Sequence, residues 1–284
     1  MSNLHLKAIL ITSLGVLLMS LESLLIKLTS ISALTFSFYI GLFMFFSINT
    51  LLFATKKTQT ILIYRKSLKP ILICGFLFGL SNIFFINAIK TTSVANTVMI
   101  FASAPLFTSL FTYLLYKEKS KKNIYIASLF IFIGLFIIFS SQLGKGDLLG
   151  NIYALVCVIL FALSFVILGR YKDANRFAIT AFAGLSSTFI SFLFVSNFNI
   201  DANTLFVLLL AGVLVSPISR VLMGIGTKSL PASEVSLLMI IETIMAPVWV
   251  WIFLKEVPAN STFIGGSIIL LTLLLNSIYI LKNK

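Results

Sequence analysis

The chain alternates between long apolar runs and short polar breaks along its whole length. Each run has about 20 residues, the length of an α-helix that crosses the hydrocarbon core of a bilayer. The run at 124–139 is apolar throughout, whereas a strand of a membrane β-barrel would alternate apolar and polar positions. The pattern therefore predicts ten transmembrane helices, at about 8–27, 34–54, 70–88, 94–116, 124–141, 149–169, 177–195, 204–224, 232–254 and 262–281.

The composition supports this interpretation. Of the 284 residues, 59% are apolar and 10% are charged, and the mean hydropathy is +1.10. Soluble domains have roughly 45–50% apolar and about 25% charged residues. The chain lacks the polar surface of a soluble fold of this size, so we predict an all-α polytopic membrane protein. The breaks between the runs are too short for a separate soluble domain.

The net charge of +13 comes from Lys and Arg residues that lie mostly in alternate breaks. The second and fourth breaks are the most basic, whereas the five odd-numbered breaks together carry only four basic residues, Lys27, Lys90, Lys145 and Lys255. Because Lys and Arg are retained on the cytoplasmic side, we expect both termini to be cytoplasmic and the protein to lie in the cytoplasmic (inner) membrane. The basic residues form no continuous face, so we expect no nucleic-acid partner.

Two segments of the chain repeat one pattern at a fixed spacing. Residues 88–119 and 226–257 align without gaps at an offset of 138. Each has a basic residue, an apolar span that contains a proline, and a closing Lys-Glu pair. The charged positions that coincide are Lys90 with Lys228, Lys117 with Lys255, and Glu118 with Glu256.

The position of the two segments predicts an inverted repeat. They are the fourth and ninth runs, so each is the fourth helix of a five-helix unit, and we divide the chain into repeats at 1–141 and 142–284. Because five is odd, the second unit enters the membrane from the opposite side. Inverted repeats are typical of secondary carriers, whose substrate site lies near the midplane between the repeats.

This organisation resembles the EamA-type ten-helix carriers of the drug/metabolite transporter superfamily over nearly the whole chain. The resemblance rests on the small residues from Ala95 to Pro105, on the Ile241–Pro247 segment and on the two Lys-Glu ends. It implies a central cavity lined mainly by helices one, three, four, six, eight and nine, and many relatives are exporters. Lys27 stands where the family often has a lysine. The chain departs from the family at Met19-Ser20 and Ile40, where a Trp-Gly pair and an arginine are common.

Three ionisable residues fall inside the predicted spans: Glu22, Arg220 and Glu242. Such a group costs at least about 2.5–3.5 kcal/mol in hydrocarbon, so it usually faces a cavity or a partner. Glu242 lies about 15 Å into its helix, near the midplane, and is our first candidate for binding an amine or carrying a proton. Glu22 is a candidate substrate contact or gate, or half of an ion pair. Arg220 is a candidate for binding a substrate carboxylate, or it snorkels or pairs with a neighbouring helix.

Uncharged polar residues supply further candidates for the substrate site. Asn82, Asn96 and Ser103 either line the cavity or form hydrogen bonds between helices. Trp249 is a candidate cavity wall, and Trp251, two residues away, must then face another direction. We interpret Glu118 and Glu256 as residues that end a span or pack against its neighbours.

The residues of most enzyme sites are missing from the sequence. His5, in the N-terminal tail, is the only histidine, which excludes a histidine-based triad and an HExxH zinc site. There is no GxxxxGK[ST] phosphate loop, and we interpret Cys74 and Cys157 as buried free thiols. We therefore expect no catalytic residues, metal or cofactor, and no enzymatic activity.

These observations together predict a secondary transporter of a small polar metabolite. We expect an amino acid or an amine as substrate, export as the direction, and proton coupling as a possible energy source. Two alternatives stay open: an uptake carrier for a nucleotide-like or S-adenosylmethionine-like compound, and a non-transporting membrane scaffold. The sequence leaves a monomer and a homodimer equally open.

Overall fold

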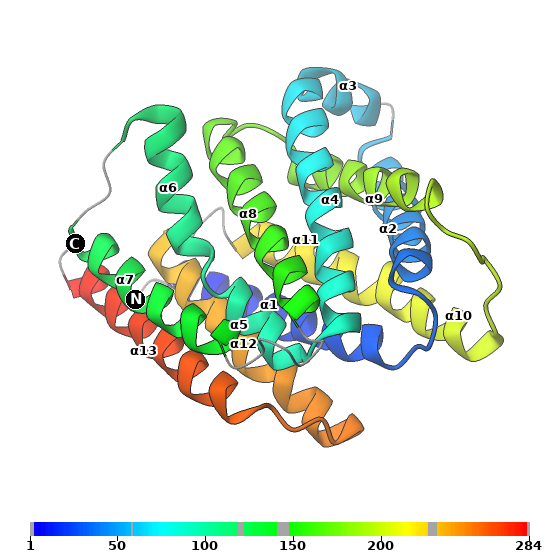
Figure 1. The fold of residues 1–284 in the computed structure, drawn as a ribbon. Coiled ribbons are helices and arrows are strands. Elements are labelled where there is room, and N and C mark those ends of the chain that lie inside the picture. The colour runs from blue at the N-terminus through cyan, green and yellow to red at the C-terminus, as the bar shows by residue number, and fades with distance from the viewer. Residues whose placement is uncertain (1–2, 58, 119–121, 141–147, 227–231, 283–284) are drawn as a thin grey trace.

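The fold is a bundle of α-helices, seen in a computed structural model that describes residues 3–57, 59–118, 122–140, 148–226 and 232–282 (Figure 1). Those residues contain no β-strand. The helices, with one π-helical segment η1, are α1 Asn3–Lys27, α2 Ala33–Lys56, α3 Gln59–Lys66, α4 Leu68–Thr91, α5 Val94–Phe101, α6 Ala104–Tyr116, α7 Lys122–Ser140, α8 Leu148–Arg170, α9 Arg176–Phe192, α10 Ala202–Leu209, η1 Leu210–Val215, α11 Ser216–Gly226, α12 Ala232–Leu254 and α13 Asn260–Lys282.

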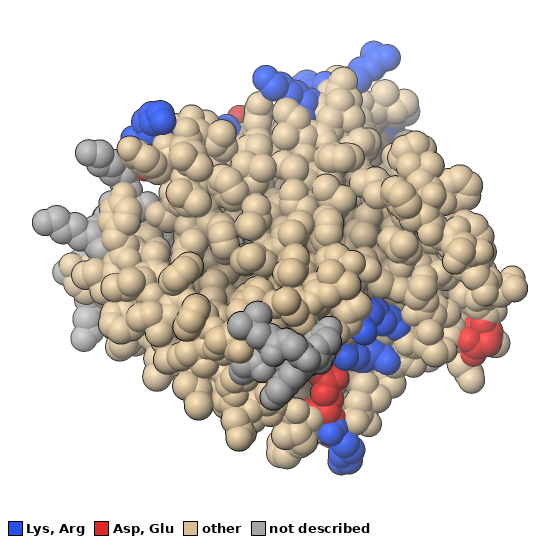
Figure 2. Space-filling view, in the orientation of Figure 1, with Lys and Arg blue, Asp and Glu red and all other residues tan. Residues whose placement is uncertain are grey.

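Each of the ten predicted spans corresponds to one helix or to consecutive helical segments. Among the described residues, seven segments are long and apolar enough to cross a membrane. Three further apolar segments are shorter, at Arg176–Phe192, Leu238–Leu254 and Asn260–Asn276. The surface agrees, because in Figure 2 a wide zone without Lys, Arg, Asp or Glu separates charged residues near the upper and lower edges. The protein is therefore an all-α, multi-pass membrane protein, as the hydrophobic pattern predicts.

The structure differs from the predicted spans at three places. A short helix, α3, forms in the basic break between the second and third spans, which we did not expect to be helical. The fourth span is divided into α5 and α6 just before Pro105, which lies in the first turn of α6. The eighth span contains η1 immediately before Ser216 and Pro217. Proline removes an N–H donor and crowds the preceding turn, which accounts for both interruptions of the apolar spans.

Corresponding helices of the two halves make corresponding contacts. Helix α1 packs against α11 and α12, and α8 packs against α4, α5 and α6. If each helix is replaced by its equivalent in the other half, the contacts of α1 become those of α8. The pairs α2·α9 and α7·α13 each join a helix to its equivalent in the other half. In Figure 1, α4 descends, whereas α6 and α8 rise and end at the top. These contacts fit two inverted five-helix repeats; the boundary at 141/142 lies outside the described residues and stays a prediction.

Small residues allow these helices to approach closely. A Cβ atom on Gly41 of α2 would lie 2.6 Å from the Gly184 carbonyl of α9, and a Cβ on Gly134 of α7 would lie 2.7 Å from the Gly265 carbonyl of α13. Glycine at such contacts brings two helix backbones together, as is common where lipid provides little drive for helix association. These tight contacts fix the scaffold that surrounds the embedded polar residues.

Candidate functional site

The structure brings two of the three embedded ionisable residues into direct contact. Glu22, on α1, is buried, with 5% of the residue exposed. One of its carboxylate oxygens accepts a hydrogen bond from the Ser216 hydroxyl at 2.7 Å, and the other lies 3.4 Å from Nη1 of Arg220. Arg220 thus pairs with a neighbouring helix, one of the roles that the sequence left open. An ion pair with a second donor is the arrangement that makes a buried carboxylate tolerable.

The irregular eighth span positions both partners of Glu22. Pro217 has no N–H to donate to the Val213 carbonyl four residues earlier, and the Ser47 hydroxyl of α2 donates to that carbonyl at 3.2 Å. Just after η1, Ser216 faces α1, and its own carbonyl accepts a bond from Nη1 of Arg220 at 3.3 Å. The π-helical segment shifts the register of the following turn, which allows α11 to present a hydroxyl and a guanidinium to one carboxylate.

Glu242 lies on α12 and is 6% exposed. The charges of Glu22 and Arg220 both act on its carboxyl group, and its charge acts on Cys157 of α8. Unlike Glu22, it accepts no hydrogen bond from any donor among the residues that the structure describes. A buried carboxylate without a donor is costly, so Glu242 is the group of this cluster that most needs a ligand or a proton. Its helix, α12, packs against α1, α5 and α13.

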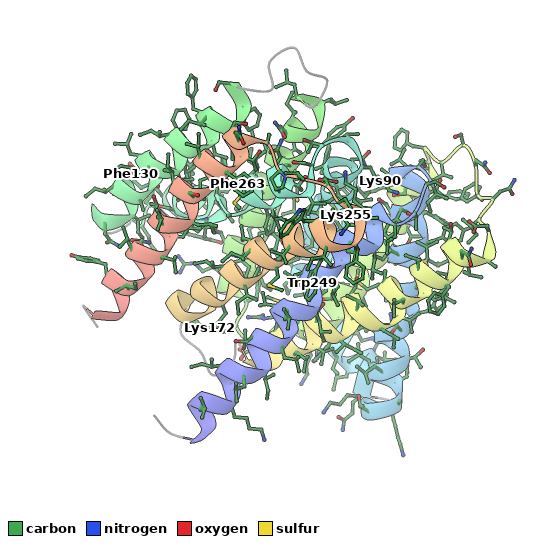
Figure 3. All side chains as sticks on the ribbon, turned by 90° about the horizontal axis from the view of Figure 1, so that it is seen from below. Lys90, Phe130, Lys172, Trp249, Lys255 and Phe263 are labelled. Carbon is green, nitrogen blue, oxygen red and sulfur yellow. The ribbon has the colours of Figure 1, made fainter. Side chains whose placement is uncertain are left out.

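The two tryptophans of α12 point in different directions, as their spacing predicts. The indole N–H of Trp249 donates to the Ser20 hydroxyl of α1 at 2.9 Å, whereas Trp251 is 55% exposed on the outside. Figure 3 shows Trp249 where α12 crosses α1. Because Ser20 lies two residues before Glu22, the Trp249 contact fastens α12 close to the carboxylate cluster.

Three other candidates from the sequence lie apart from this cluster in the described contacts. Ser103 is fully buried at the α5–α6 break, and its hydroxyl donates to the Ile100 carbonyl at 2.6 Å. Asn82, on α4, is half-buried beside Ser81. Neither makes a described hydrogen bond to Glu22, Arg220 or Glu242.

Asn96, the third of these candidates, belongs to a separate polar network. Its amide nitrogen donates to Thr92 at 3.2 Å and to Asn151 of α8 at 3.3 Å, and its amide oxygen accepts a bond from Thr262 of α13. This network joins α4, α5, α8 and α13, so Asn96 makes the interhelical bonds that were one of its two predicted roles.

Two further ion pairs join helix ends that sequence reasoning did not connect. Nζ of Lys27, at the end of α1, lies 3.2 Å from a carboxylate oxygen of Glu256, just beyond α12. Arg170, at the end of α8, pairs with Glu118, just beyond α6. We expected the two glutamates only to end spans or to pack. Glu118 and Glu256 occupy equivalent positions at the 138-residue offset, and this equivalence was the sequence signal that both form the same kind of ion pair.

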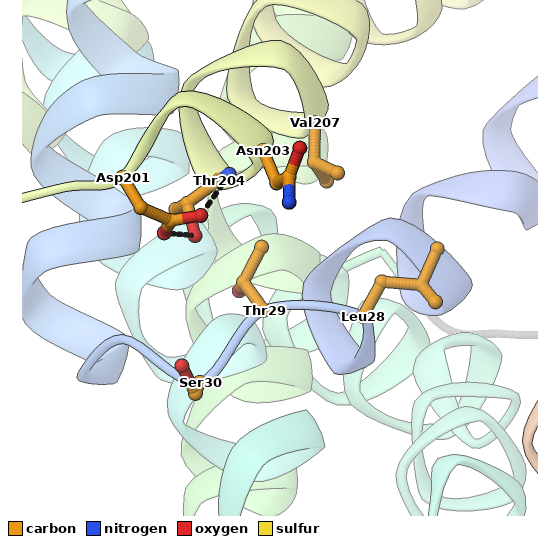
Figure 4. A pocket seen from close by; sticks show the side chains of 7 residues that line it. All are labelled: Leu28, Thr29, Ser30, Asp201, Asn203, Thr204 and Val207. Atoms are coloured by element: carbon orange, nitrogen blue, oxygen red, sulfur yellow. Dashed lines mark hydrogen bonds between the residues drawn. The ribbon is translucent and has the colours of Figure 1, made fainter.

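A surface pocket of about 320 Å³ is lined by residues other than Glu22, Arg220 and Glu242 (Figure 4). It lies between the end of α1 and the start of α10 and is lined by Leu28, Thr29, Ser30, Asp201, Asn203, Thr204 and Val207. Its only ionisable side chain, Asp201, is already occupied as the N-cap of α10. We therefore take the cluster around Glu242 as the candidate substrate site. Within the described residues, no group of three His, Cys, Asp or Glu side chains is placed to hold a metal ion.

Comparison with known proteins gives a consistent result. The model of the EamA-like transporter family matches the chain twice, at residues 6–140 and 148–278. The "Uncharacterized transporter YdfC" of Bacillus subtilis (strain 168) is 26% identical over 233 residues, which cover 78% of this chain and 74% of that protein. The "Uncharacterized transporter sll1164" of Synechocystis sp. (strain ATCC 27184 / PCC 6803 / Kazusa) is 23% identical over 214 residues, covering 69% of this chain and 61% of that protein.

A solved structure has the same fold. It is titled "Crystal structure of protein" and aligns with a TM-score of 0.67 at 17% identity, over 96% of this chain and 97% of the other.

Proposed function

Because the chain belongs to the EamA-like transporter family, we propose that it exports a small amine or amino acid across the cytoplasmic membrane by alternating access. Membrane transport follows from the family and from the uncharacterised transporters that it resembles. The substrate, the direction and the orientation, with both termini cytoplasmic, are our proposals. We further propose that the protein has no enzymatic activity.

The observation that carries the choice of substrate is the state of Glu242. The cluster has two carboxylates and one guanidinium, and the guanidinium is already paired with Glu22. Glu242 is buried and has no hydrogen-bond donor among the described residues. An ammonium group supplies both a positive charge and N–H donors, so it meets both needs of this carboxylate. A primary amine, either alone or as part of an amino acid, is therefore the best match.

Proton coupling follows from the same residue. A carboxyl group that binds either a proton or an ammonium, but not both, exchanges one for the other during the transport cycle. An inward proton gradient then drives export of the amine. Under this scheme Glu242 is the coupling residue, and Glu22 and Arg220 set the charge around it.

The test is flux in proteoliposomes with a panel of amines and amino acids. The wild-type protein should show saturable flux of at least one of them, driven by an imposed proton gradient. Glu242→Gln keeps the size of the side chain but removes its charge, so we expect flux to fall at least about tenfold, as for loss of a charge-assisted contact. Asp173→Asn, an exposed carboxylate in the α8–α9 loop, is the matched control and should leave flux unchanged. Full activity in Glu242→Gln would remove Glu242 from the mechanism.

A second candidate rests on Arg220. Its side chain is 27% exposed beside the two glutamates, so the cluster also offers a cation to a zwitterion. This feature favours the uptake of an S-adenosylmethionine-like or nucleotide-like compound. Saturable uptake of such a compound by the wild-type protein, lost in Arg220→Met, would favour this candidate over amine export.

A scaffold without transport activity makes a different prediction. A scaffold would tolerate the double change Glu22→Gln/Glu242→Gln, because neutral amides of the same size preserve the packing. A carrier would keep its fold but lose all flux.

A further inference from the structure

The ion pairs at the helix ends are equivalent in the repeat. Lys27 ends the first helix of the first half and pairs with Glu256, which follows the fourth helix of the second half. Arg170 ends the first helix of the second half and pairs with Glu118, which follows the fourth helix of the first half. Exchanging the halves therefore turns one pair into the other.

The backbone at the two glutamates is the same as well. Lys117 and Lys255 both take a left-handed conformation with φ of 58°. Each donates its N–H to the carbonyl four residues earlier, on Tyr113 at 2.8 Å and on Trp251 at 3.1 Å. A left-handed residue ends a helix and redirects the chain. The same terminus thus aims each glutamate at the first helix of the opposite half.

The two ion pairs lie at opposite ends of the bundle. Helix α4 ends and α5 begins at the bottom of Figure 1, whereas α6 and α8 end at the top. The Lys27–Glu256 pair touches the end of α4 and the start of α5, so it lies at the bottom. Arg170–Glu118 lies at the top. The positive-inside orientation makes the first end extracellular and the second cytoplasmic.

The extracellular pair holds four helix ends together. Nζ of Lys27 also donates to the Thr92 carbonyl at the end of α4, at 2.9 Å. The other oxygen of Glu256 accepts a bond from the Val94 N–H at the start of α5, at 2.8 Å. The two side chains are only 21% and 26% exposed. This pair therefore ties together the ends of α1 and α4, the start of α5 and the end of α12.

The cytoplasmic pair is more exposed. The side chains of Arg170 and Glu118 are 46% and 57% exposed, and the guanidinium lies 4.0 Å from the centre of the Tyr116 ring. Among the described residues, this pair joins the ends of α6 and α8 alone. An ion pair this exposed stabilises a contact only weakly, so this end opens more readily than the other.

Both ion pairs are formed in this structure. We propose that they are the gates of the transporter, and that opening the site to one side breaks the pair at that side while the other pair stays formed. The proposal rests on the transport function proposed above. With Lys27–Glu256 formed, the Glu242 site is shut from outside. Breaking that pair while Arg170–Glu118 stays formed opens the site outward, and breaking Arg170–Glu118 while Lys27–Glu256 stays formed opens it to the cytoplasm. Because the pairs are equivalent, the two states use the same chemistry at opposite ends, as inverted repeats require.

The experiment measures access to the substrate site from each side, and needs no substrate. Cys74→Ala/Cys157→Ala removes both native thiols, and Glu242→Cys then places the only thiol at the site. A charged, membrane-impermeant thiol reagent is applied to right-side-out and to inverted vesicles. Glu256→Gln keeps an oxygen for the Val94 N–H but removes the ion pair. It should raise labelling from outside about threefold, the order by which a partly exposed ion pair shifts an equilibrium.

The second gate should respond in the opposite sense. Glu118→Gln should raise labelling from the cytoplasmic side, also about threefold. The charge exchange Glu118→Arg/Arg170→Glu should return the rate to that of the background. Lys255→Gln and Lys172→Gln are the matched controls, because they change exposed neighbours that have no ion pair among the described residues; both should leave the rates unchanged.

The outcomes separate this proposal from the transport function. Labelling that rises from the same side in both gate variants, or that equals the controls in both, overturns the gates even if flux is normal. Absent flux in the wild-type protein, with opposite labelling shifts, instead overturns the proposed transport and keeps the two gates. Labelling in detergent gives the total amount of reactive thiol, so each rate is compared at equal amounts of it.

Discussion

Glu22 and Glu242 lie in the same apolar interior but are satisfied differently. Glu22 has a hydroxyl donor and a guanidinium, whereas Glu242 has no donor in the described part of the chain. The cost of burying charge is met for the first residue by the fold itself. For Glu242 that cost is met only when a ligand or a proton binds. This is the physical distinction between a structural and a ligand-binding carboxylate.

The first prediction at the residue scale concerns the pair of Glu22 and Arg220. Arg220→Met leaves the Glu22 carboxylate with Ser216 alone, so we expect a loss of about 1–3 kcal/mol in stability. The double variant Glu22→Gln/Arg220→Met should lose less than the single one, because no unpaired charge remains. Thermal unfolding of the purified variants in detergent measures both. Equal or additive losses would show that the two residues are not coupled.

A second residue-scale prediction concerns Asp201, which lies just before the eighth span. Hydrogen bonds to this carboxylate, led by that of the Thr204 side chain, hold its pKa below the usual value. Because the folded pKa is the lower one, the ionised cap stabilises α10 above the unfolded value of about 3.9. That stabilisation is lost as the pH falls from about 4 through the folded pKa.

Hydrogen exchange at the first turn of α10 tests this pH dependence. After correction for intrinsic rates, exchange at Thr204 and Leu205 should accelerate below about pH 4 in the wild-type protein. Asp201→Asn keeps a capping oxygen but cannot titrate in this range, so its corrected exchange should stay flat. A matching acceleration in Asp201→Asn would assign the effect to another group.

At the scale of elements, interrupted helices place the polar groups. Pro217 and η1 direct Ser216 and Arg220 towards α1, and the break before Pro105 places Ser103 at a bend within the fourth span. A continuous helix would keep its backbone groups bonded to one another. Its interruption frees carbonyls that side chains then bind, as Ser47 binds Val213. Polar side chains and irregular backbone therefore occur together in the eighth span.

The prediction at the element scale concerns the contact of α2 with α9. Gly41→Ala would place a Cβ atom 2.6 Å from the Gly184 carbonyl and 2.7 Å from the Thr188 hydroxyl. The backbones must separate, so we expect a loss of about 1–3 kcal/mol, seen as a lower unfolding temperature. Gly169→Ala, where nothing lies within 4 Å, is the control and should gain up to about 1 kcal/mol from helix propensity. Equal effects of the two substitutions would contradict tight packing at Gly41.

At the scale of the whole molecule, exchanging the halves relates one set of helix contacts to the other. Helices α1 and α8, the first helices of the two halves, each contact the third and fourth spans of the opposite half. The Glu242 cluster lies in the set that contains α1, α11 and α12. Each gate pair lies at the helix ends of one set: Lys27–Glu256 in the set of α1, and Arg170–Glu118 in the set of α8. A rocking motion of one set against the other therefore changes access to Glu242 without breaking the scaffold pairs α2·α9 and α7·α13.

The prediction at this scale is the sidedness of the repeated segments. Lys117→Cys and Lys255→Cys stand at equivalent left-handed positions, so any strain is the same in both. In the background without native cysteines, an impermeant thiol reagent should label position 117 from the cytoplasmic side and position 255 from outside. Labelling of both positions from one side would end the inverted arrangement.

The sequence alone determined the class and span order of this protein. Runs of about 20 apolar residues must become helices in a bilayer, because lipid offers the backbone no hydrogen-bond partner. The embedded residues Glu22, Arg220 and Glu242 were visible for the same reason: a charge in an apolar run is conspicuous. The matching positions of Glu118 and Glu256 in the two halves also marked the repeat.

Only the tertiary structure decided which of these residues meet. Glu22 and Arg220 are separated by 198 positions, and no periodicity along one helix says which face another helix will cover. Asn96 was equally a candidate for the cavity, and its partners on neighbouring helices decide for interhelical bonding. Helix formation depends on neighbours in the chain, whereas the pairing of polar side chains depends on how whole helices pack, and that was fixed here by close contacts and interrupted spans.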